Sequence, residues 1–363
     1  MLKLFIPTDR IGLESFQKSI SGTAATINRL LRQGVTVGWH TAPLRLDATP
    51  LWPEGHLYQC GFAVDDTEKL RTLLAEGEIV FEPTSQLPPA DYLLRPIKIA
   101  VYDGRGAGRD FSDPLVEVLS WGGFLYDYIG DSQIRSGQLM DYDVLVVPGS
   151  PDAGECYYAG LGDLGQERIR QFIATRGQYL GICGGAYLPL SAYNERNNTW
   201  LNIVEATEMD DLDYWHTGSG LVRCRIDDNG HPIFSGITAG VTTSINITYW
   251  EGPAIELRGA NVKQLAHFEQ LLASGRDPLK PCWEFQDNTM VADAVKTWHN
   301  PLSQQIFDRL LLNRCAIAEA DYHGHKIIMC SPHPEMGNIG YGPRKDSLNF
   351  LILFNSLFYL SAR

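Results

Sequence analysis

Residues 178–187, QYLGICGGAY, constrain the fold of this chain more than any other stretch. An apolar run ends at a glycine-flanked cysteine, Cys183, and residues from Ala186 onward are expected to begin a helix. A short apolar run bounded by glycine predicts a buried parallel strand. A strand, a tight turn and a helix in this order are typical of the elbow that presents a catalytic nucleophile, with cysteine here in place of serine. The stretch therefore predicts an α/β protein with a candidate nucleophile at Cys183.

The residue types around Cys183 fit this interpretation physically. The turn is too tight for side chains on both flanks of the nucleophile, so glycines stand there. The sulfur would lie at the N-terminus of a helix, where the helix dipole and free N–H groups favour the thiolate over the thiol. The N–H of Gly184 would help to hold an oxyanion. The alternative is a buried structural cysteine in a glycine-rich turn.

The length of 363 residues makes two domains the natural expectation. No apolar run reaches the ~20 residues that a membrane-spanning helix needs. The strongest candidate, residues 348–360, is interrupted by Asn349, Asn355 and Ser356, so residues 346–360 are predicted to form a C-terminal helix packed on a sheet. The first residues show neither the long apolar segment nor the cleavage site of a signal peptide.

Charge and cysteine content narrow the functional classes. The formal charge of −13 argues against a surface that binds nucleic acid or anionic membranes. Seven cysteines without CxxC spacing indicate a reducing, cytoplasmic compartment, with no disulfide framework and no zinc site. No metal and no organic cofactor is predicted. Acidic side chains cluster in one segment, where we expect a solvated loop, with cation or partner binding as the alternative: Glu205, Glu208, Asp210, Asp211 and Asp213.

The chain divides into three segments. Residues 1–82 are predicted to form a small α/β accessory domain. Its expected strands are 2–7, 35–39, 56–64 and 78–81, and its expected helices are one capped at 21–23 and stopped by Gly34, and one at 67–75. Residues 83–95 are predicted to be an extended, proline-rich linker. A second α/β domain is then predicted over residues 96–363.

The second domain begins with alternating strands and helices. The expected strands are 97–102, 123–128, 143–147 and 178–182, and the expected helices are 114–119 and 164–175. The glycine-rich loop 103–109 lacks the spacing of a nucleotide-binding loop. Beyond the elbow we expect strands at 200–208, 220–226 and 245–250 and a helix at 264–273, whereas residues 277–301 show no pattern. Residues 315–320 and 326–331 predict an antiparallel pair, whose turn histidines, His323 and His325, lack a third metal ligand nearby.

A base for Cys183 is predicted late in the chain, where residues 326–331 lead into Pro332-His333-Pro334-Glu335. A cysteine nucleophile needs a base to generate the thiolate, and the base needs an orienting partner. In an extended segment, residues i and i+2 point to the same side. Glu335 would then accept from one imidazole nitrogen of His333 while the other faces Cys183. The alternative is a surface histidine beside a glutamate.

Four motifs together resemble the class I glutamine amidotransferase superfamily, and more narrowly the glutamine-amidotransferase-like domain at the N-terminus of some biotin–protein ligases. They are residues 101–104 (VYDG), 147–150 (VPGS), 181–187 (GICGGAY) and 249–253 (YWEGP), with the late PHPE at 332–335. The resemblance covers residues 96–363. It implies a three-layer α/β/α, flavodoxin-like domain with a mostly parallel sheet.

The resemblance also implies roles for particular residues. Cys183 would be the nucleophile, His333 the base and Glu335 its orienting partner. The N–H of Gly184, with a backbone N–H from Gly149 or Ser150, would form the oxyanion hole. Gly185 and Tyr187 would contact substrate. Tyr187 stands where members that use glutamine usually carry Gln or Met, so glutamine itself is not predicted as the substrate.

Three hypotheses remain open at this stage. The first is an enzyme that hydrolyses an amide or related acyl bond of a small molecule through a Cys183 thioester. The second is a binding or regulatory module that keeps the fold without turnover, with the N-terminal domain as a docking surface for a protein partner. The third is transfer of an amide nitrogen to a separate partner protein.

Overall fold

The computed structural model describes most of the chain. The described residues are 2–8, 10–11, 14–47, 52–107, 109–150, 155–191, 199–208, 218–237, 243–274, 302–336 and 347–362. The predictions for Asp210, Asp211, Asp213 and residues 277–301 lie outside these ranges. Among the described residues, no helix combines the length and the hydropathy required to cross a bilayer.

The larger of two main sheets has eleven strands and a mixed topology. One half is parallel, in the order β11 (Tyr126–Ile129), β10 (Ile99–Tyr102), β12 (Val144–Val147), β13 (Gln178–Ile182) and β20 (His325–Cys330). The other half is antiparallel, with β19 (Cys315–Tyr322), β18 (Val262–Ser274), β15 (Ser219–Ile226) and β16 (Ser244–Trp250), and with β17 (Ile255–Leu257) and β14 (Ala206–Glu208) beside it. The sheet is therefore mixed rather than mostly parallel, because the chain returns through hairpins after the elbow.

The parallel strands bury side chains on both faces, as their continuous apolar sequences require. On β12, Val144 and Val146 join a hydrophobic cluster that includes residues of α3 (Arg109–Trp121) and α9 (Phe350–Ser361). Their neighbours Leu145 and Val147 join a second cluster that includes residues of α5 (Glu155–Thr175). Successive residues of a strand point to opposite faces, so these helices cover opposite sides of β12. Strand β13 lies between β12 and β20 and is buried at its centre.

The smaller sheet has five antiparallel strands: β8 (Glu82–Thr84), β1 (Lys3–Pro7), β7 (Gly61–Asp65), β4 (Val37–His40) and β9 (Tyr92–Leu94). It carries α1 (Ile20–Arg32) and α2 (Glu68–Glu76), with short pairs β2 (Arg10–Ile11) and β3 (Glu14–Ser15), and β5 (Leu44–Leu46) and β6 (His56–Tyr58). Both ends of the segment predicted as a linker pair as edge strands, β8 and β9. The smaller sheet therefore extends to Leu94, beyond the expected boundary at residue 82.

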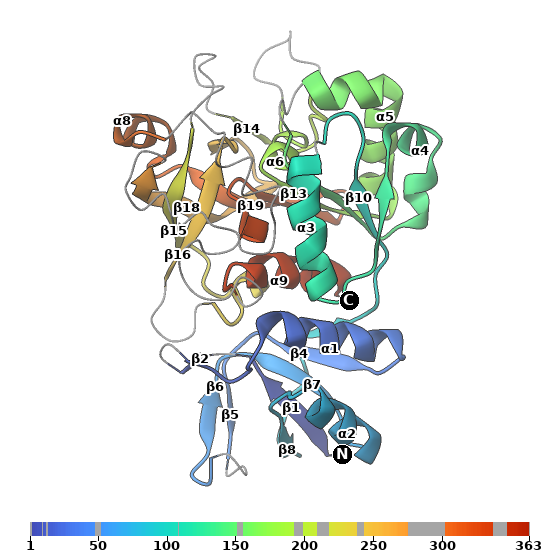
Figure 1. Ribbon diagram of the computed structural model, residues 1–363, viewed down its shortest axis with the longest axis vertical. Helices are drawn as coiled ribbons and strands as arrows, with labels where there is room; N and C mark the ends of the chain where they lie inside the picture. The colour runs from blue at the N-terminus through green and yellow to red at the C-terminus, as the bar shows by residue number, and fades with distance from the viewer. Residues whose placement is uncertain are drawn as a thin grey trace.

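Helix α1 joins the two parts of the molecule, because it lies between the smaller sheet and α9 (Figure 1). One hydrophobic cluster runs through both sheets. Within it the Phe358 ring of α9 contacts Trp39 and Phe62 of the smaller sheet. The buried Asn28 side chain of α1 donates a 2.8 Å hydrogen bond to the carbonyl of Gly122, just after α3. The first 94 residues are thus packed against the rest rather than tethered to it.

Replacing Asn28 by alanine is expected to lower the free energy of unfolding by about 1–2 kcal/mol, because the buried Gly122 carbonyl loses its donor. Urea unfolding of the full chain measures this change. Arg29→Ala is the matched control, since Arg29 is exposed on the same helix and its loss should matter little. Equal midpoints for the two variants would contradict the structural role of Asn28.

Several predicted elements differ from the structure. Residues 264–273, predicted as a helix, belong to strand β18, which pairs with β15 and β19 on its two sides and carries bulges in both pairings. Strand β14 takes only the end of the predicted strand 200–208, and the strand expected at 78–81 is replaced by β8. Helix α3 begins at Arg109 and contains Pro114, and α5 begins at Glu155, with a break at Gly162 where φ is 57°.

Candidate active site

The sharp turn after β13 places Cys183 at the end of the parallel half of the sheet. Its backbone has φ 52° and ψ −111°, and α6 (Gly184–Tyr187) follows at once. A positive φ is costly for a residue with a side chain and persists only where the surroundings enforce it. The predicted order of strand, turn and helix is therefore present, and Cys183 itself adopts the strained backbone conformation.

Close backbone contacts explain the glycines of the elbow. A Cβ added at Gly185 would lie 2.0 Å from the Val147 carbonyl oxygen. At Gly181 it would lie 2.1 Å from the Gly185 carbonyl oxygen. At Gly184 it would lie 2.6 Å from the backbone nitrogen of Ser150. The residue after Cys183 and the loop after β12 thus touch, and the two predicted sources of oxyanion donors, Gly184 and the Gly149–Ser150 loop, lie side by side.

Two buried tyrosines hold the elbow and the loop after β12 through hydrogen bonds to their carbonyls. The Tyr179 hydroxyl of β13 donates a 2.6 Å hydrogen bond to the Gly185 carbonyl. The Tyr157 hydroxyl of α5 donates a 2.6 Å hydrogen bond to the Pro148 carbonyl. Each bond satisfies a carbonyl in one of the two touching loops. Neither role could be predicted, because nothing in the local sequence of these tyrosines signals a bond to a loop backbone.

His333 and Glu335 form a fully buried pair beyond the end of β20. The imidazole Nδ1 lies 2.6 Å from the carboxylate Oε1, and the two side chains are 0% and 2% exposed. The segment is not extended as expected, because residues Pro334–Met336 form a 3₁₀ turn. The His333 N–H donates to the carbonyl of Thr248 on β16, which fixes the start of this turn. The turn, rather than an extended strand, brings the two side chains together.

The Cys183 sulfur lies close enough to His333 to affect the pKa of the imidazole. Burial lowers the pKa of His333, but the Cys183 sulfur and the Glu335 carboxylate raise it, and the balance puts it well above its usual value. The His333 Nε2 makes no hydrogen bond of ordinary geometry with the described residues. The Cys183 thiol donates instead to the Trp250 carbonyl at 3.1 Å. The structure thus brings sulfur, imidazole and carboxylate into one buried cluster with the thiol hydrogen-bonded to backbone.

Trp250 contributes a contact that the sequence did not predict. It ends β16, and its ring centroid lies 6.4 Å from that of His333. The turn after β16 packs closely against the residue that follows β20, since a Cβ at Gly252 would lie 2.0 Å from the Ser331 carbonyl oxygen. Residues 249–253 contributed to the family resemblance, but a carbonyl that accepts from a thiol leaves no signature in a sequence.

Tyr187 lies at the end of α6 and is 7% exposed. Its hydroxyl donates to the Glu208 carboxylate at 3.0 Å and lies 3.2 Å from the Glu251 carbonyl oxygen. Burial, with the Glu208 and Cys183 charges, raises the pKa of Tyr187 well above its usual value, so the ring stays neutral. The Tyr187 hydroxyl thus lies close enough to Cys183 for the sulfur to affect its pKa.

The charge balance at His333 predicts a pH-dependent stability. A histidine with a raised folded-state pKa stabilises the fold fully below its unfolded pKa of about 6.5, and this contribution is lost as the pH rises through the folded-state pKa. Glu335→Gln removes one of the two groups that raise the pKa. We expect its free energy of unfolding to fall less from pH 6.5 to higher pH than that of the wild type, as measured by urea unfolding.

Glu256→Gln is the control for this comparison, since Glu256 is a half-exposed residue of β17. It should follow the wild-type pH dependence. Parallel curves for the wild type and Glu335→Gln would contradict the assignment of the raised pKa to this pair.

The comparisons with known proteins match this part of the chain. Residues 137–215 match the sequence family described as "Biotin-protein ligase, N terminal". This match confirms the predicted resemblance to the glutamine amidotransferase-like class, and the matched segment includes β12, β13 and Cys183. None of the curated proteins matches the chain.

Several solved structures align with much of the chain at low identity. The structure of PurLQS from Thermotoga maritima is 14% identical, covers 72% of this chain and 98% of its own, and has a TM-score of 0.43. A cytoplasmic protein from Salmonella typhimurium is 13% identical, with coverages of 73% and 99% and a TM-score of 0.43. A glutamine amidotransferase from Thermotoga maritima is 10% identical, with coverages of 67% and 78% and a TM-score of 0.36. Similarities at this level assign neither an activity nor a substrate.

Proposed function

We propose that this protein is a cysteine-dependent enzyme that cleaves an amide or related acyl bond in a small molecule. Cys183 is the nucleophile, His333 the base and Glu335 the residue that orients it. The observation that carries the proposal is the buried His333–Glu335 pair, 2.6 Å apart, whose imidazole pKa is raised by the Cys183 sulfur. A buried imidazolium is the partner that holds a neighbouring cysteine as the thiolate.

The proposed reaction has two steps. The Cys183 sulfur attacks the carbonyl carbon, and the oxyanion accepts from the N–H groups of Gly184 and of Gly149 or Ser150. His333 protonates the leaving amine as the C–N bond breaks, which leaves a thioester on sulfur. Water, deprotonated by His333, then attacks the thioester carbonyl and releases the acid and the thiol. Gly185 and Tyr187 line the side of the elbow where substrate binds.

The proposal also includes the domain architecture, the cellular compartment and the partners of the protein. We infer that residues 96–363 form the three-layer α/β/α domain of the superfamily, supported by the two hydrophobic clusters that share the strands. Residues 1–82 and the following segment to 95 act as an accessory unit that offers a docking surface to a protein partner. We infer a cytoplasmic setting, because Cys183, Cys224, Cys315 and Cys330 carry free thiols. Nucleic acid and membranes are not among the proposed partners, given the net charge of −13.

One observation favours a second function, a binding or regulatory module without turnover. The Cys183 thiol donates to the Trp250 carbonyl, and Cys183 is only 4% exposed. A thiol that donates to a backbone carbonyl must give up this bond before it can act as a thiolate nucleophile. The enzyme hypothesis requires this bond to break when substrate enters, whereas a binding module keeps it.

Mass spectrometry of the intact protein distinguishes the two functions. We expect iodoacetamide, a mild thiol electrophile, to label Cys183 first, and one member of a panel of amides to leave an acyl adduct that Cys183→Ala lacks. Among the cysteines that the structure describes, accessibility alone would favour Cys156, which is half-buried, so Cys156→Ala is the control. Labelling of Cys156 before Cys183, with no acyl adduct, would support the binding module.

Glutamine tests a third possibility, transfer of an amide nitrogen to a partner protein. That reaction requires ammonia release from glutamine, which rises when the partner is added. Because Tyr187 stands at the position expected to seat glutamine, we expect no ammonia release from glutamine alone.

A further inference from the structure

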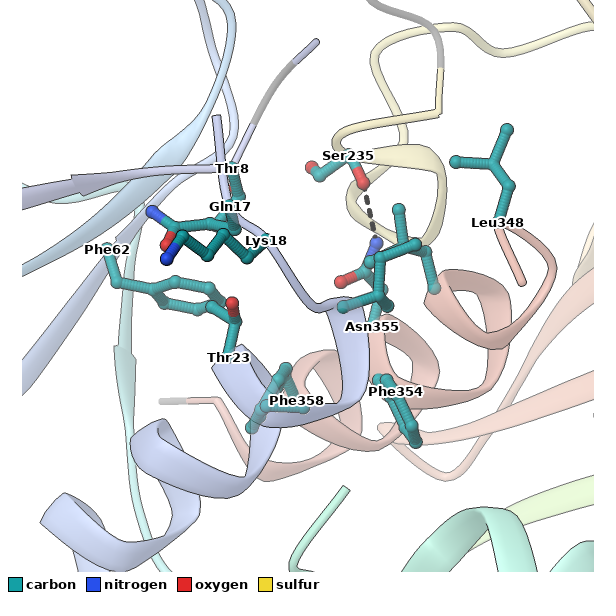
Figure 2. A pocket seen from close by; sticks show the side chains of 13 residues that line it. Thr8, Gln17, Lys18, Thr23, Phe62, Ser235, Leu348, Phe354, Asn355 and Phe358 are labelled. Atoms are coloured by element: carbon teal, nitrogen blue, oxygen red, sulfur yellow. Dashed lines mark hydrogen bonds between the residues drawn. The ribbon is translucent and has the colours of Figure 1, made fainter. Parts of the chain in front are cut away.

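A cavity lies where the smaller sheet meets the larger part of the molecule (Figure 2). Its volume is about 170 Å³. One wall comes from α1 and the segment before it, and the opposite wall comes from α9 and from Ser235, which follows the 3₁₀ turn Pro232–Phe234. None of its lining residues belongs to the proposed catalytic set. The cavity therefore calls for an explanation separate from the chemistry at Cys183.

The inner surface is largely apolar and aromatic. Phe62 of the smaller sheet and Phe354 and Phe358 of α9 line it, together with Leu351 (Figure 2). For scale, an engineered apolar cavity of ~150 Å³ binds benzene. A cavity of about 170 Å³ therefore holds one small ring system, and aromatic walls favour edge-to-face or stacked contact with it.

Asn355 supplies a directional polar group in this apolar setting. The side chain is 4% exposed and lines the cavity. Its Nδ2 donates to the carbonyls of Ile233 and Ser235, at 3.2 and 2.8 Å. Both amide hydrogens are thus used, and Oδ1 accepts from no donor among the described residues. Oδ1 is not among the buried polar atoms that lack a partner, so it is open to the cavity. A ligand that donates to it replaces a bond to water and gains a modest amount of affinity.

Lys18, the one cation among the described residues that line the cavity, does not indicate an anionic ligand. The Lys18 ammonium lies 3.3 Å from the Glu78 carboxylate, and its side chain is 70% exposed. A solvated and compensated charge of this kind adds little to binding. The chemistry of the cavity thus favours a neutral ring with one hydrogen-bond donor.

We propose that this cavity binds a small, flat, neutral aromatic molecule that carries a ring N–H or O–H group, and that Asn355 Oδ1 accepts from this group. The site goes beyond the proposed function, because it needs neither Cys183 nor His333. The ligand bridges α1 and α9, so it stabilises the packing of the N-terminal part on the rest of the chain.

Indole and 1-benzofuran test the proposal with the full chain. The two molecules have nearly the same shape, but only indole has an N–H donor. We expect indole to bind in a 1:1 ratio by calorimetry and to raise the melting temperature by about 2–4 °C at saturating concentration. We expect 1-benzofuran to bind roughly two- to tenfold more weakly, which corresponds to the loss of one hydrogen bond. Equal binding of both, or binding of neither, would overturn the proposal.

Variants locate the binding in the cavity. Ala24→Leu places three added carbons in the cavity from α1 and should abolish indole binding, while Arg29→Leu on the exposed face of the same helix should leave it unchanged. Leu348→Trp, at the half-buried rim, provides a second block should Ala24→Leu fail to fold. Cys183→Ala should bind indole as the wild type does. Loss of binding in Cys183→Ala, or its survival in both blocking variants, would place the indole elsewhere and refute the assignment.

Discussion

Alkylation of Cys183 by iodoacetamide is expected to slow about a hundredfold at neutral pH when His333 is replaced by alanine, since a positioned base of this kind contributes ~10²–10⁴ to reactions that it assists. In the proposed mechanism the His333 imidazole takes the thiol proton, and the Cys183 sulfur is among the groups that raise the pKa of this imidazole. Quenched-flow labelling followed by peptide mass spectrometry measures the rate at this one residue.

Controls separate loss of the base from loss of the fold. His267→Ala removes an imidazole that makes a similar carboxylate pair, 2.8 Å from Asp227, on β18. Its labelling rate at Cys183 should match the wild type. Alanine at His333 leaves the buried Glu335 carboxylate without its partner and costs about 3–5 kcal/mol of stability. His333→Gln, of similar size, therefore accompanies it, and near-ultraviolet circular dichroism checks that both variants are folded. Wild-type labelling rates in both would rule out His333 as the base.

Gly185→Ala is expected to be the most destabilising single-methyl change in the elbow, with a loss of more than about 3 kcal/mol in the free energy of unfolding. The added Cβ would lie 2.0 Å from the Val147 carbonyl oxygen, which is held in the centre of the sheet by its neighbours. No flexible side chain is available to move aside, so α6 and the end of β12 would have to move apart. Urea unfolding and the Cys183 labelling rate should both report the change.

Gly230→Ala provides the matched comparison. The nearest atom to its added Cβ is the Asp228 Oδ1 at 3.6 Å, an ordinary contact. Its free energy of unfolding should change by no more than about 0.5 kcal/mol. A Gly185→Ala protein as stable as Gly230→Ala would mean that the elbow relaxes and that its glycines are not required by close packing.

The elbow could be predicted because its constraints are local. The order of strand, tight turn and helix around Cys183 follows from neighbouring residues, and the sequence around them carries the signal. The contacts of Gly184 with Ser150 and of Gly185 with Val147, by contrast, come from an earlier strand and loop. The position of Glu335 beside His333 was also accessible from spacing, although the segment is a 3₁₀ turn and not an extended strand. A contact between residues close together in the sequence could therefore be predicted, even though the local backbone conformation was predicted wrongly.

Long-range pairing explains what could not be predicted. Residues 264–273 are rich in leucine, alanine, glutamine and glutamate, which favour helix, yet they form part of β18 because β15 and β19 offer backbone partners on both sides. The strands β8 and β9 likewise depend on β1 and β4, far from them in the chain. The Trp250 carbonyl that accepts from the Cys183 thiol is 67 positions away, and a backbone atom has no residue type to reveal it.

The connection between Cys183, Trp250 and His333 has a consequence for protein synthesis. Each of the three lies at or just beyond the end of a different strand: β13, β16 and β20. Domains emerge from the ribosome N-terminus first, and non-local contacts form last. A nascent chain that ends before β20 lacks His333 beside its sulfur, so we expect the proposed reactivity of the thiol to appear only after residues 333–335 have been synthesised.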